Sequence, residues 1–231
     1  MIPLIEDLTT GTIPAGSNIL LEFDPASQWY NASLTIAAGW LNTGGKLTYL
    51  LSSRAPDDVR SQLTRLGIDV QRLEGNDTLQ IWDAYSVTLG FQSREKYRME
   101  SLNVADLRIS VSRGFMRQPP SPDLMYITEN SSVLARFNDE KSWIEYQLTR
   151  VFPSVSMTKA KNIRGISVGV HSDSVYKQLE GAVDGVVDLK VEEVEGELHN
   201  FIRVRKMLNA KFDARWHRLK VNDNFEITLE K

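Results

Sequence analysis

The order of apolar segments along the chain constrains the fold more than any single residue does. Short apolar runs typical of buried strands, among them 18–23, 46–51 and 124–128, are separated by stretches with the apolar spacing of helices. Strands that alternate with helices are joined by crossovers and form a parallel sheet. The sequence therefore predicts an α/β domain whose mostly parallel central sheet is flanked by helices.

The pattern of the remaining segments extends this prediction to the whole chain. We expect further helices at 29–41, 56–66, 99–116, 144–155 and 175–179, and further strands at 68–73, 78–82, 163–170 and 183–191. After Glu197 the residues alternate between apolar and polar, which favours antiparallel strands at 198–206, 214–221 and 224–230. No linker divides the chain, so we expect one domain over 1–231, with a core at about 11–191 and a β-hairpin extension at about 198–231.

Composition excludes several classes of chemistry. The 231 residues contain no cysteine, which rules out disulfides, a thiol nucleophile and cysteine-ligated metals. The three histidines, His171, His199 and His217, lack metal-ligand spacing, so we expect no metal site. No apolar run has the length of a membrane span, and the first residues lack the pattern of a signal peptide. We therefore expect a cytoplasmic protein without membrane contact.

Residues 23–30 occupy the place of a phosphate-binding loop, but the side chains that do its work are replaced. In the pattern G-x-x-x-x-G-K-[ST], glycines let backbone N–H groups approach phosphate oxygens, the lysine neutralises charge and the hydroxyl binds magnesium. The eight positions hold Phe23, Asp24, Pro25, Ala26, Ser27, Gln28, Trp29 and Tyr30. We predict a vestigial nucleotide pocket that Trp29 and Tyr30 plug or reuse, although an ordinary strand–turn–helix gives the same pattern.

Segments on both sides of this loop resemble the RecA-type ATPase core, and within it the KaiC-like branch common in archaea. Gly11-x-Ile13-x-x-Gly16-Ser17 is similar to the family's segment before the first strand, and residues 47–69 are similar to its second strand and the helix that follows. Near the end, AVDGVVDL at 182–189 and RVRKM at 203–207 resemble two late strands of the family. The resemblance covers nearly the whole chain and implies a RecA-like fold.

The departures from the family pattern fall on its catalytic positions. Besides the missing lysine, Thr128 stands where the resemblance places the magnesium-binding Walker B carboxylate, and Glu129 lies one residue further on. Ser53 and Arg54 stand where the family's paired glutamates would activate water. Because the phosphate cradle, the metal ligand and the general base are all missing, the resemblance implies a protein without ATPase activity.

The C-terminal stretch from 203 to 220 is basic, although the formal net charge of the chain is −3. Its candidate contact residues are Arg203, Arg205, Lys206, Arg215, Trp216 and Arg218. Alternating Arg and Lys on a solvated hairpin would protect a sheet edge. The family resemblance implies a second role, in which Lys206 and Arg215 reach a neighbouring subunit. A third role is contact with nucleic acid, in which Trp216 stacks on bases.

Two shorter motifs have structural explanations. Asp24 precedes Pro25, which favours a role in the turn. His171, Ser172 and Asp173 contain the residue types of a catalytic triad, but sequence neighbours do not form triad geometry. We expect Ser172 or Asp173 to cap the next helix.

We expect a catalytically inactive KaiC-like protein that acts as a regulatory or assembly subunit, alone or with an active paralogue, and uses no cofactor. One alternative is a weak ATPase in which Glu129 or Asp24 holds magnesium and Lys46 or Lys206 replaces the missing lysine. The other is a RadB-like recombination accessory that binds single-stranded DNA through Arg215 and Arg218.

Overall fold

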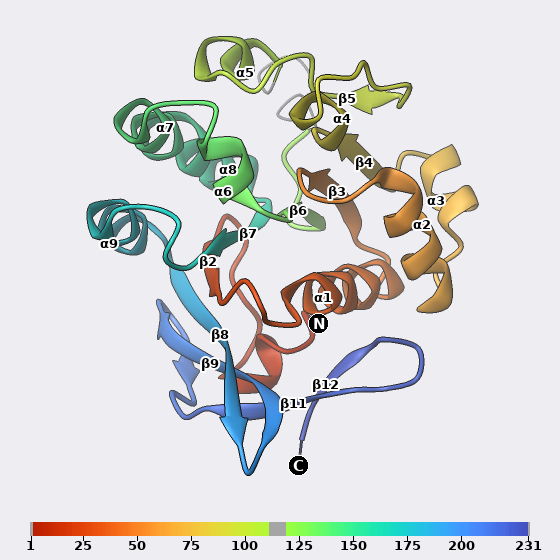
Figure 1. Ribbon diagram of the computed structural model, residues 1–231. Coiled ribbons are helices and arrows are strands. Elements are labelled where there is room, and N and C mark those ends of the chain that lie inside the picture. The colour runs from red at the N-terminus through yellow and green to blue at the C-terminus, as the bar shows by residue number, and fades with distance from the viewer. Residues whose placement is uncertain (1, 111–118, 231) are drawn as a thin grey trace.

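The computed structural model describes residues 2–110 and 119–230, and one large mixed sheet organises them (Figure 1). Its strand order is β12-β11-β9-β8-β2-β7-β6-β3-β4-β5, and the strands from β8 to β5 run parallel. The strands are β2 (Asn18–Phe23), β3 (Lys46–Leu51), β4 (Leu79–Asp83), β5 (Tyr97–Arg98), β6 (Leu124–Thr128), β7 (Lys161–Ser167), β8 (Gly185–Val194), β9 (Glu197–Met207), β11 (His217–Val221) and β12 (Ile227–Leu229). Separately, β1 (Thr9–Thr10) pairs with β10 (Lys211–Phe212).

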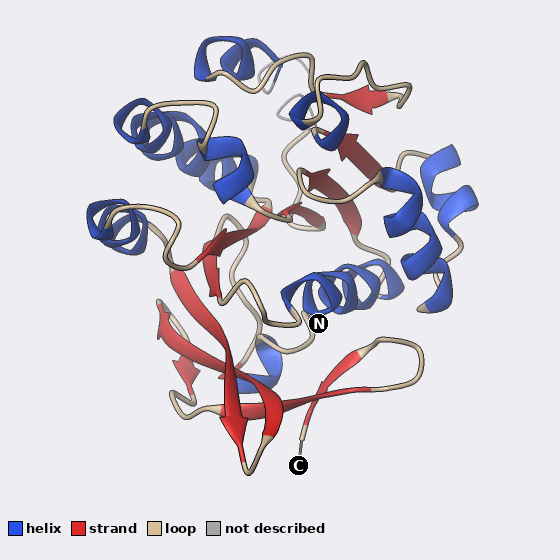
Figure 2. Ribbon diagram, viewed as in Figure 1, coloured by secondary structure: helices blue, strands red, loops and turns tan. Residues whose placement is uncertain are grey.

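Helices cover both faces of the parallel part of the sheet (Figure 2). One face packs against α1 (Trp29–Asn42), α2 (Pro56–Arg65), α3 (Val70–Gly75) and the short 3₁₀ helix at Glu6–Leu8. The other face packs against α5 (Val104–Ser110), α6 (Ser131–Ala135), α7 (Glu140–Tyr146), α8 (Phe152–Thr158) and α9 (Asp173–Ala182). The helix α4 (Tyr85–Thr88) follows β4. The expected α/β architecture is therefore confirmed.

The two faces follow from the alternation of side chains along each strand. In β2, Ile19 and Leu21 point into the core under α1, whereas Leu20 points into the core under α7 to α9. Since both faces are covered, β2 is buried along its whole length. The tight loop that follows β2 lies between the ends of β7 and β8, its two neighbours in the sheet.

The C-terminal strands extend the sheet instead of forming a layer of their own. The strand β9 pairs antiparallel with β8 along nearly its full length, and β11 and β12 continue the sheet outward. The backbone N–H of Ile227 in β12 donates to the Thr35 hydroxyl of α1 at 2.9 Å. The antiparallel extension is confirmed, and it packs under α1.

Several expected elements differ from those observed. Residues 68–73 contain helix α3 and no strand, because Asp69 caps a turn by accepting from the Arg72 N–H while Val70 and Leu73 face the core. The predicted helix 99–116 begins only at Val104, and its residues 111–116 lie outside the described part of the chain. The strand β7 ends at Ser167, before a turn at Gly169 with φ of 77°.

The helix expected at 144–155 is interrupted by a π-helical turn at Gln147–Val151 that joins α7 to α8. Pro153 is in the first turn of α8. A proline tolerates this position because its missing N–H needs no partner at the start of a helix. The helical path therefore continues from α7 through the π-helical turn into α8.

Candidate functional site

The loop from Asp24 to Gln28 joins β2 to α1 at the carboxyl end of the parallel strands, which is where open α/β sheets bind ligands. Its backbone N–H groups are already donated. The N–H of Asp24 donates to the Leu189 carbonyl at 2.9 Å, and the N–H of Ser27 donates to the Asp24 carbonyl at 2.8 Å. The N–H of Ala26 donates to the Asp24 carboxylate at 2.8 Å, and Pro25 has none. The expected turn role of Asp24 is what the geometry shows.

The last N–H of the loop is held by the C-terminal extension. Gln28 donates its N–H to the side-chain oxygen of Asn200 in β9 at 2.8 Å, and its own side-chain oxygen accepts from Asn31 at 2.7 Å. A phosphate loop works because such N–H groups point at the anion. Here protein acceptors occupy each of them from residue 24 to residue 28.

Trp29, at the lysine position, turns inward and is 2% exposed. Its indole N–H donates to the Glu129 carbonyl at 2.5 Å, and its ring stacks on Phe23 with centroids 5.7 Å apart. A Cβ on Gly165 of β7 would lie 2.6 Å from the indole nitrogen, so only glycine leaves this space free. The indole therefore fills the corner between the ends of β2, β6 and β7.

Tyr30, at the hydroxyl position, is half-buried beside Arg54. The Arg54 guanidinium lies 5.0 Å from the centre of the Tyr30 ring, which is cation–π distance. Burial raises the pKa of the Tyr30 hydroxyl to about 12, although Arg54 acts in the opposite direction. The Tyr30 hydroxyl is therefore neutral at physiological pH and lies beside a cation, so it is not the kind of oxygen ligand that magnesium usually binds.

Glu129 is buried and turns toward Ser53, just after the end of β3. Its carboxylate accepts from the Ser53 hydroxyl at 2.6 Å and from the Ser53 and Ser52 backbone N–H groups at 3.0 and 3.4 Å. Burial raises the pKa of the Glu129 carboxyl, and the hydrogen bonds from Ser53 oppose that rise. Among the described residues no cluster of His, Asp or Glu has the geometry of a metal site.

Thr128 does not belong to this group. Its side chain is fully buried on the opposite face of the sheet, among Leu50, Leu134 and Trp143. Side chains alternate between the two faces of the sheet along β6. Ile127 points toward α1, so Thr128, the next residue, points to the other face. The expectation that Thr128 lines the loop pocket is therefore wrong.

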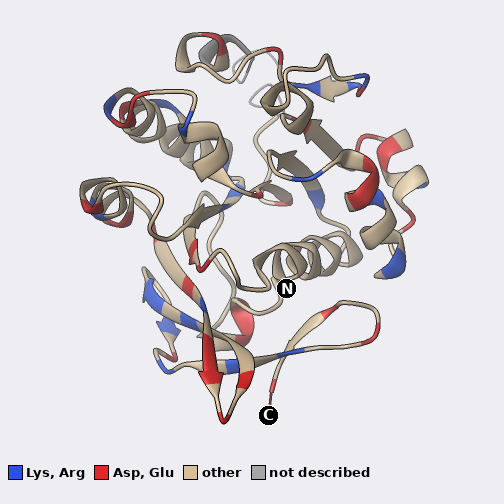
Figure 3. Ribbon diagram, viewed as in Figure 1, with Lys and Arg blue, Asp and Glu red and all other residues tan. Residues whose placement is uncertain are grey.

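Basic residues of β9 pair with acidic residues of neighbouring elements, and Figure 3 shows that β8 and β9 carry charges of both signs. Arg203 pairs with Asp188 at 2.8 Å, and Arg205 pairs with Glu22 at 2.8 Å and with Glu180 at 2.9 Å. Partners so close neutralise the field that would attract a polyanion. Burial raises the pKa of Glu22 to about 7, and Arg205 acts against that rise.

Trp216 lies between two cations at the side of the loop. The Arg203 guanidinium is 4.3 Å and the Lys190 amine 4.5 Å from its ring centre. These residues border a shallow cavity of about 360 Å³ that also touches Asp24 and Pro25. Trp216 is thus engaged by its own chain and does not stand out as a free stacking platform.

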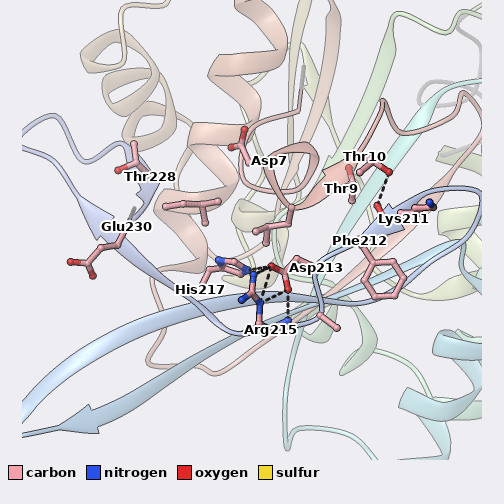
Figure 4. Close-up of a pocket in the computed structure, with 13 residues that line it drawn as sticks. Asp7, Thr9, Thr10, Lys211, Phe212, Asp213, Arg215, His217, Thr228 and Glu230 are labelled. Atoms are coloured by element: carbon pink, nitrogen blue, oxygen red, sulfur yellow. Dashed lines mark hydrogen bonds and ion pairs between the residues drawn. The ribbon is translucent and has the colours of Figure 1, made fainter.

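Arg215 and Arg218 are likewise paired. Arg215 donates to Asp213 at 2.6 Å in the lining of an open pocket of about 890 Å³, where His217 lies beside the same carboxylate (Figure 4). Hydrogen bonds from Arg215 hold the pKa of Asp213 well below its usual range. Arg218 contacts Glu230 at 3.2 Å.

Neither lysine of the ATPase alternative is near the loop. Lys206 donates its amine to the carbonyls of Glu180 and Val183 at 2.7 Å each, at the C-terminal end of α9. Lys46 is the first residue of β3, whereas the loop follows the last residue of a strand parallel to it. The structure therefore contradicts both residues as substitutes for the missing lysine.

His171, Ser172 and Asp173 form no triad. The Ser172 hydroxyl donates to Glu140 of α7 at 2.7 Å, and the His171 ring stacks on Trp143 with centroids 5.8 Å apart. Burial lowers the pKa of His171. Ser172 stands at the N-cap of α9 but makes no capping bond, because Glu140 holds its hydroxyl.

Comparisons with known proteins give distant relatives over nearly the whole chain. No family model matches it. The UPF0273 protein PH0284 of Pyrococcus horikoshii is 26% identical over 230 residues, which cover 96% of this chain and 89% of that protein. The UPF0273 protein SSO1861 of Saccharolobus solfataricus is 24% identical over 225 residues, which cover 96% of this chain and 79% of that protein.

Two solved structures share the fold. The KaiC-like protein PH0186 of Pyrococcus horikoshii matches with a TM-score of 0.73 and 15% identity, and the flagellar accessory protein FlaH of Methanocaldococcus jannaschii with 0.77 and 14%. Each match covers 100% of this chain and 96% of the other. The expected RecA-like fold of KaiC-like type is confirmed. No helix in the described part of the chain has the length and apolarity to cross a bilayer.

Proposed function

We propose that this chain, which has the KaiC-like fold, is a non-catalytic member of that fold group and acts as a regulatory or assembly subunit through protein–protein contacts. The observation that carries the proposal is the loop after β2, where each backbone N–H from residue 24 to residue 28 donates to the protein itself. A triphosphate would have to break these bonds, and the lysine that binds the β- and γ-phosphates in phosphate loops is missing here.

The buried indole of Trp29 supports the same conclusion. It occupies the corner beside Gly165 and is fixed by its bond to the Glu129 carbonyl. Reopening the corner requires an indole to leave a site where it is 2% exposed. Since the scaffold is complete and its loop is closed, we favour contact with other proteins over catalysis as the function.

The weak-ATPase alternative would need magnesium at Glu129 or Asp24. The Glu129 carboxylate already accepts from Ser53 at 2.6 and 3.0 Å, and the Asp24 carboxylate accepts from the Ala26 N–H at 2.8 Å. The DNA-binding alternative would need free cations, whereas Arg203, Arg205 and Arg215 are each paired with an acid. Both alternatives therefore have less support than a contact function.

Native mass spectrometry of the protein purified from its own host, with and without ATP and magnesium, tests the proposal. We expect an assembly of several copies, or of this chain with a second protein, that carries no nucleotide and whose mass does not change when MgATP is added. A lone monomer would contradict the contact function. A mass increment of MgATP would contradict the loss of nucleotide binding.

A further inference from the structure

A buried arginine on the side of the sheet away from the loop has no acidic partner among the residues that the structure describes. Arg164, in β7, is 5% exposed, and among the described residues no Asp or Glu side chain forms an ion pair with it. The residues between the described ranges, 111–118, have the sequence VSRGFMRQ and contain no carboxylate side chain. Burying a charge without a partner is strongly unfavourable, so native proteins pair such groups.

Loss of a proton from the Arg164 guanidinium does not remove the cost of burying its charge. Burial lowers the pKa of Arg164 to about 10, which still leaves the guanidinium charged near neutral pH. The Tyr146 hydroxyl acts in the other direction and favours the charged form. Arg164 is therefore a cation inside the core under α7, and something must compensate its charge.

The polar atoms around Arg164 converge on one small cavity. Thr128 of β6 is the direct register partner of Arg164 in the parallel β6–β7 pair, and both side chains line the cavity. The Thr128 hydroxyl and the Arg164 Nε atom are buried and have no hydrogen-bond partner among the described residues. Gln147, at the start of the π-helical turn, brings a third polar group whose amide oxygen also lacks a partner there.

The size of the cavity limits what it can hold. Its volume is about 30 Å³, and its remaining described walls are apolar or aromatic, among them Leu50, Met99 and Trp143. A space of roughly 10–15 Å³ suffices for one water molecule. The cavity can therefore hold one or two atoms or ions of that size and is too small for an organic ligand. π-Helical turns are frequent at functional sites, which agrees with a role for the turn at Gln147.

We propose that this cavity holds one small monovalent anion of the halide class, such as chloride, bound by the Arg164 guanidinium and the Thr128 hydroxyl. The anion supplies the negative charge that the chain omits, and it accepts from two donors that otherwise have no partner. The Gln147 amide turns its NH₂ group toward the anion, since the two orientations of an amide occupy the same space. Thr128 thus serves a site on the face opposite the loop.

Crystals of the full chain grown with bromide as the only halide test the site directly. We expect an anomalous bromide peak within contact distance of Arg164 and Thr128. A water at full occupancy in that position, or no peak there, overturns the proposal. This measurement uses the wild-type protein and does not depend on whether a variant folds.

Equilibrium unfolding at constant ionic strength, with chloride replacing the larger anion gluconate, gives the second test. Once the site is near saturation, each tenfold rise in chloride should raise the folding equilibrium constant about tenfold. The response should vanish in Arg164→Gln and require several-fold more chloride in Thr128→Val. The matched control Arg150→Gln, at an exposed arginine of the same helical segment, should respond like wild type. A wild type that does not respond to chloride overturns the proposal.

Discussion

Replacing Trp29 by alanine measures how far the loop corner depends on the indole. Trp29 is 2% exposed and stacks on Phe23, so Trp29→Ala leaves a cavity of the kind that costs about 3–5 kcal/mol. It also removes the donor to the Glu129 carbonyl, which adds about 1 kcal/mol or more where that oxygen stays buried. We expect a total loss of about 4–6 kcal/mol in the free energy of unfolding, measured by urea titration followed by circular dichroism.

Two controls separate packing from hydrogen bonding. Trp29→Phe keeps an aromatic ring but loses the N–H and part of the ring volume, so we expect it to cost about 1–3 kcal/mol, less than Trp29→Ala. Trp216→Ala removes a partly exposed indole that stacks on Lys190 and Arg203, and we expect a loss of about 1 kcal/mol. A loss below about 1 kcal/mol for Trp29→Ala would refute the reasoning, because it would mean that the corner is not a packed part of the core.

Three further predictions follow from neighbouring contacts. Gly165→Ala places a Cβ 2.6 Å from the Trp29 indole, so we expect about 1–3 kcal/mol of destabilisation by urea unfolding, and an unchanged stability would contradict the tight approach. Asn200→Ala removes the acceptor of the Gln28 N–H, and hydrogen exchange at that amide should accelerate at least tenfold, whereas an unaltered rate would show that the bond does not hold the loop. Burial raises the pKa of Glu22 to about 7 from an ordinary value of 4.5, so the unfolded state loses its proton first as the pH rises between these values. Over that range wild type should lose about 2 kcal/mol relative to Glu22→Gln, and parallel pH profiles would contradict the raised pKa.

The sequence predicted the parallel sheet and the loop because both depend on local patterns. The apolar run of β2 and the helical spacing after it place a loop near 24–28 without any tertiary information. The prediction of a strand at 68–73 was wrong. A short segment with apolar residues at Val70 and Leu73 is compatible with the spacing of a strand or of a helix, and the cap at Asp69 stabilises the helix.

The environment of the loop was not predictable in the same way. Asn200 lies 172 residues from Gln28, and nothing in its neighbourhood marks it as an acceptor for the loop. The direction of Trp29 depends on the space above Gly165, a residue with no local signal for that role. Likewise, the acidic partners of the basic stretch could not be predicted from the sequence, since Arg205 pairs with Glu22, 183 residues away.

Isothermal titration calorimetry with MgATP tests the central claim, that the loop after β2 is closed to nucleotides. We expect no binding heat with wild type at ligand concentrations up to millimolar, because Trp29 fills the corner and the N–H groups from residue 24 to residue 28 are donated within the protein. Magnesium-dependent binding with a stoichiometry near one, weakened by Glu129→Gln, would contradict it.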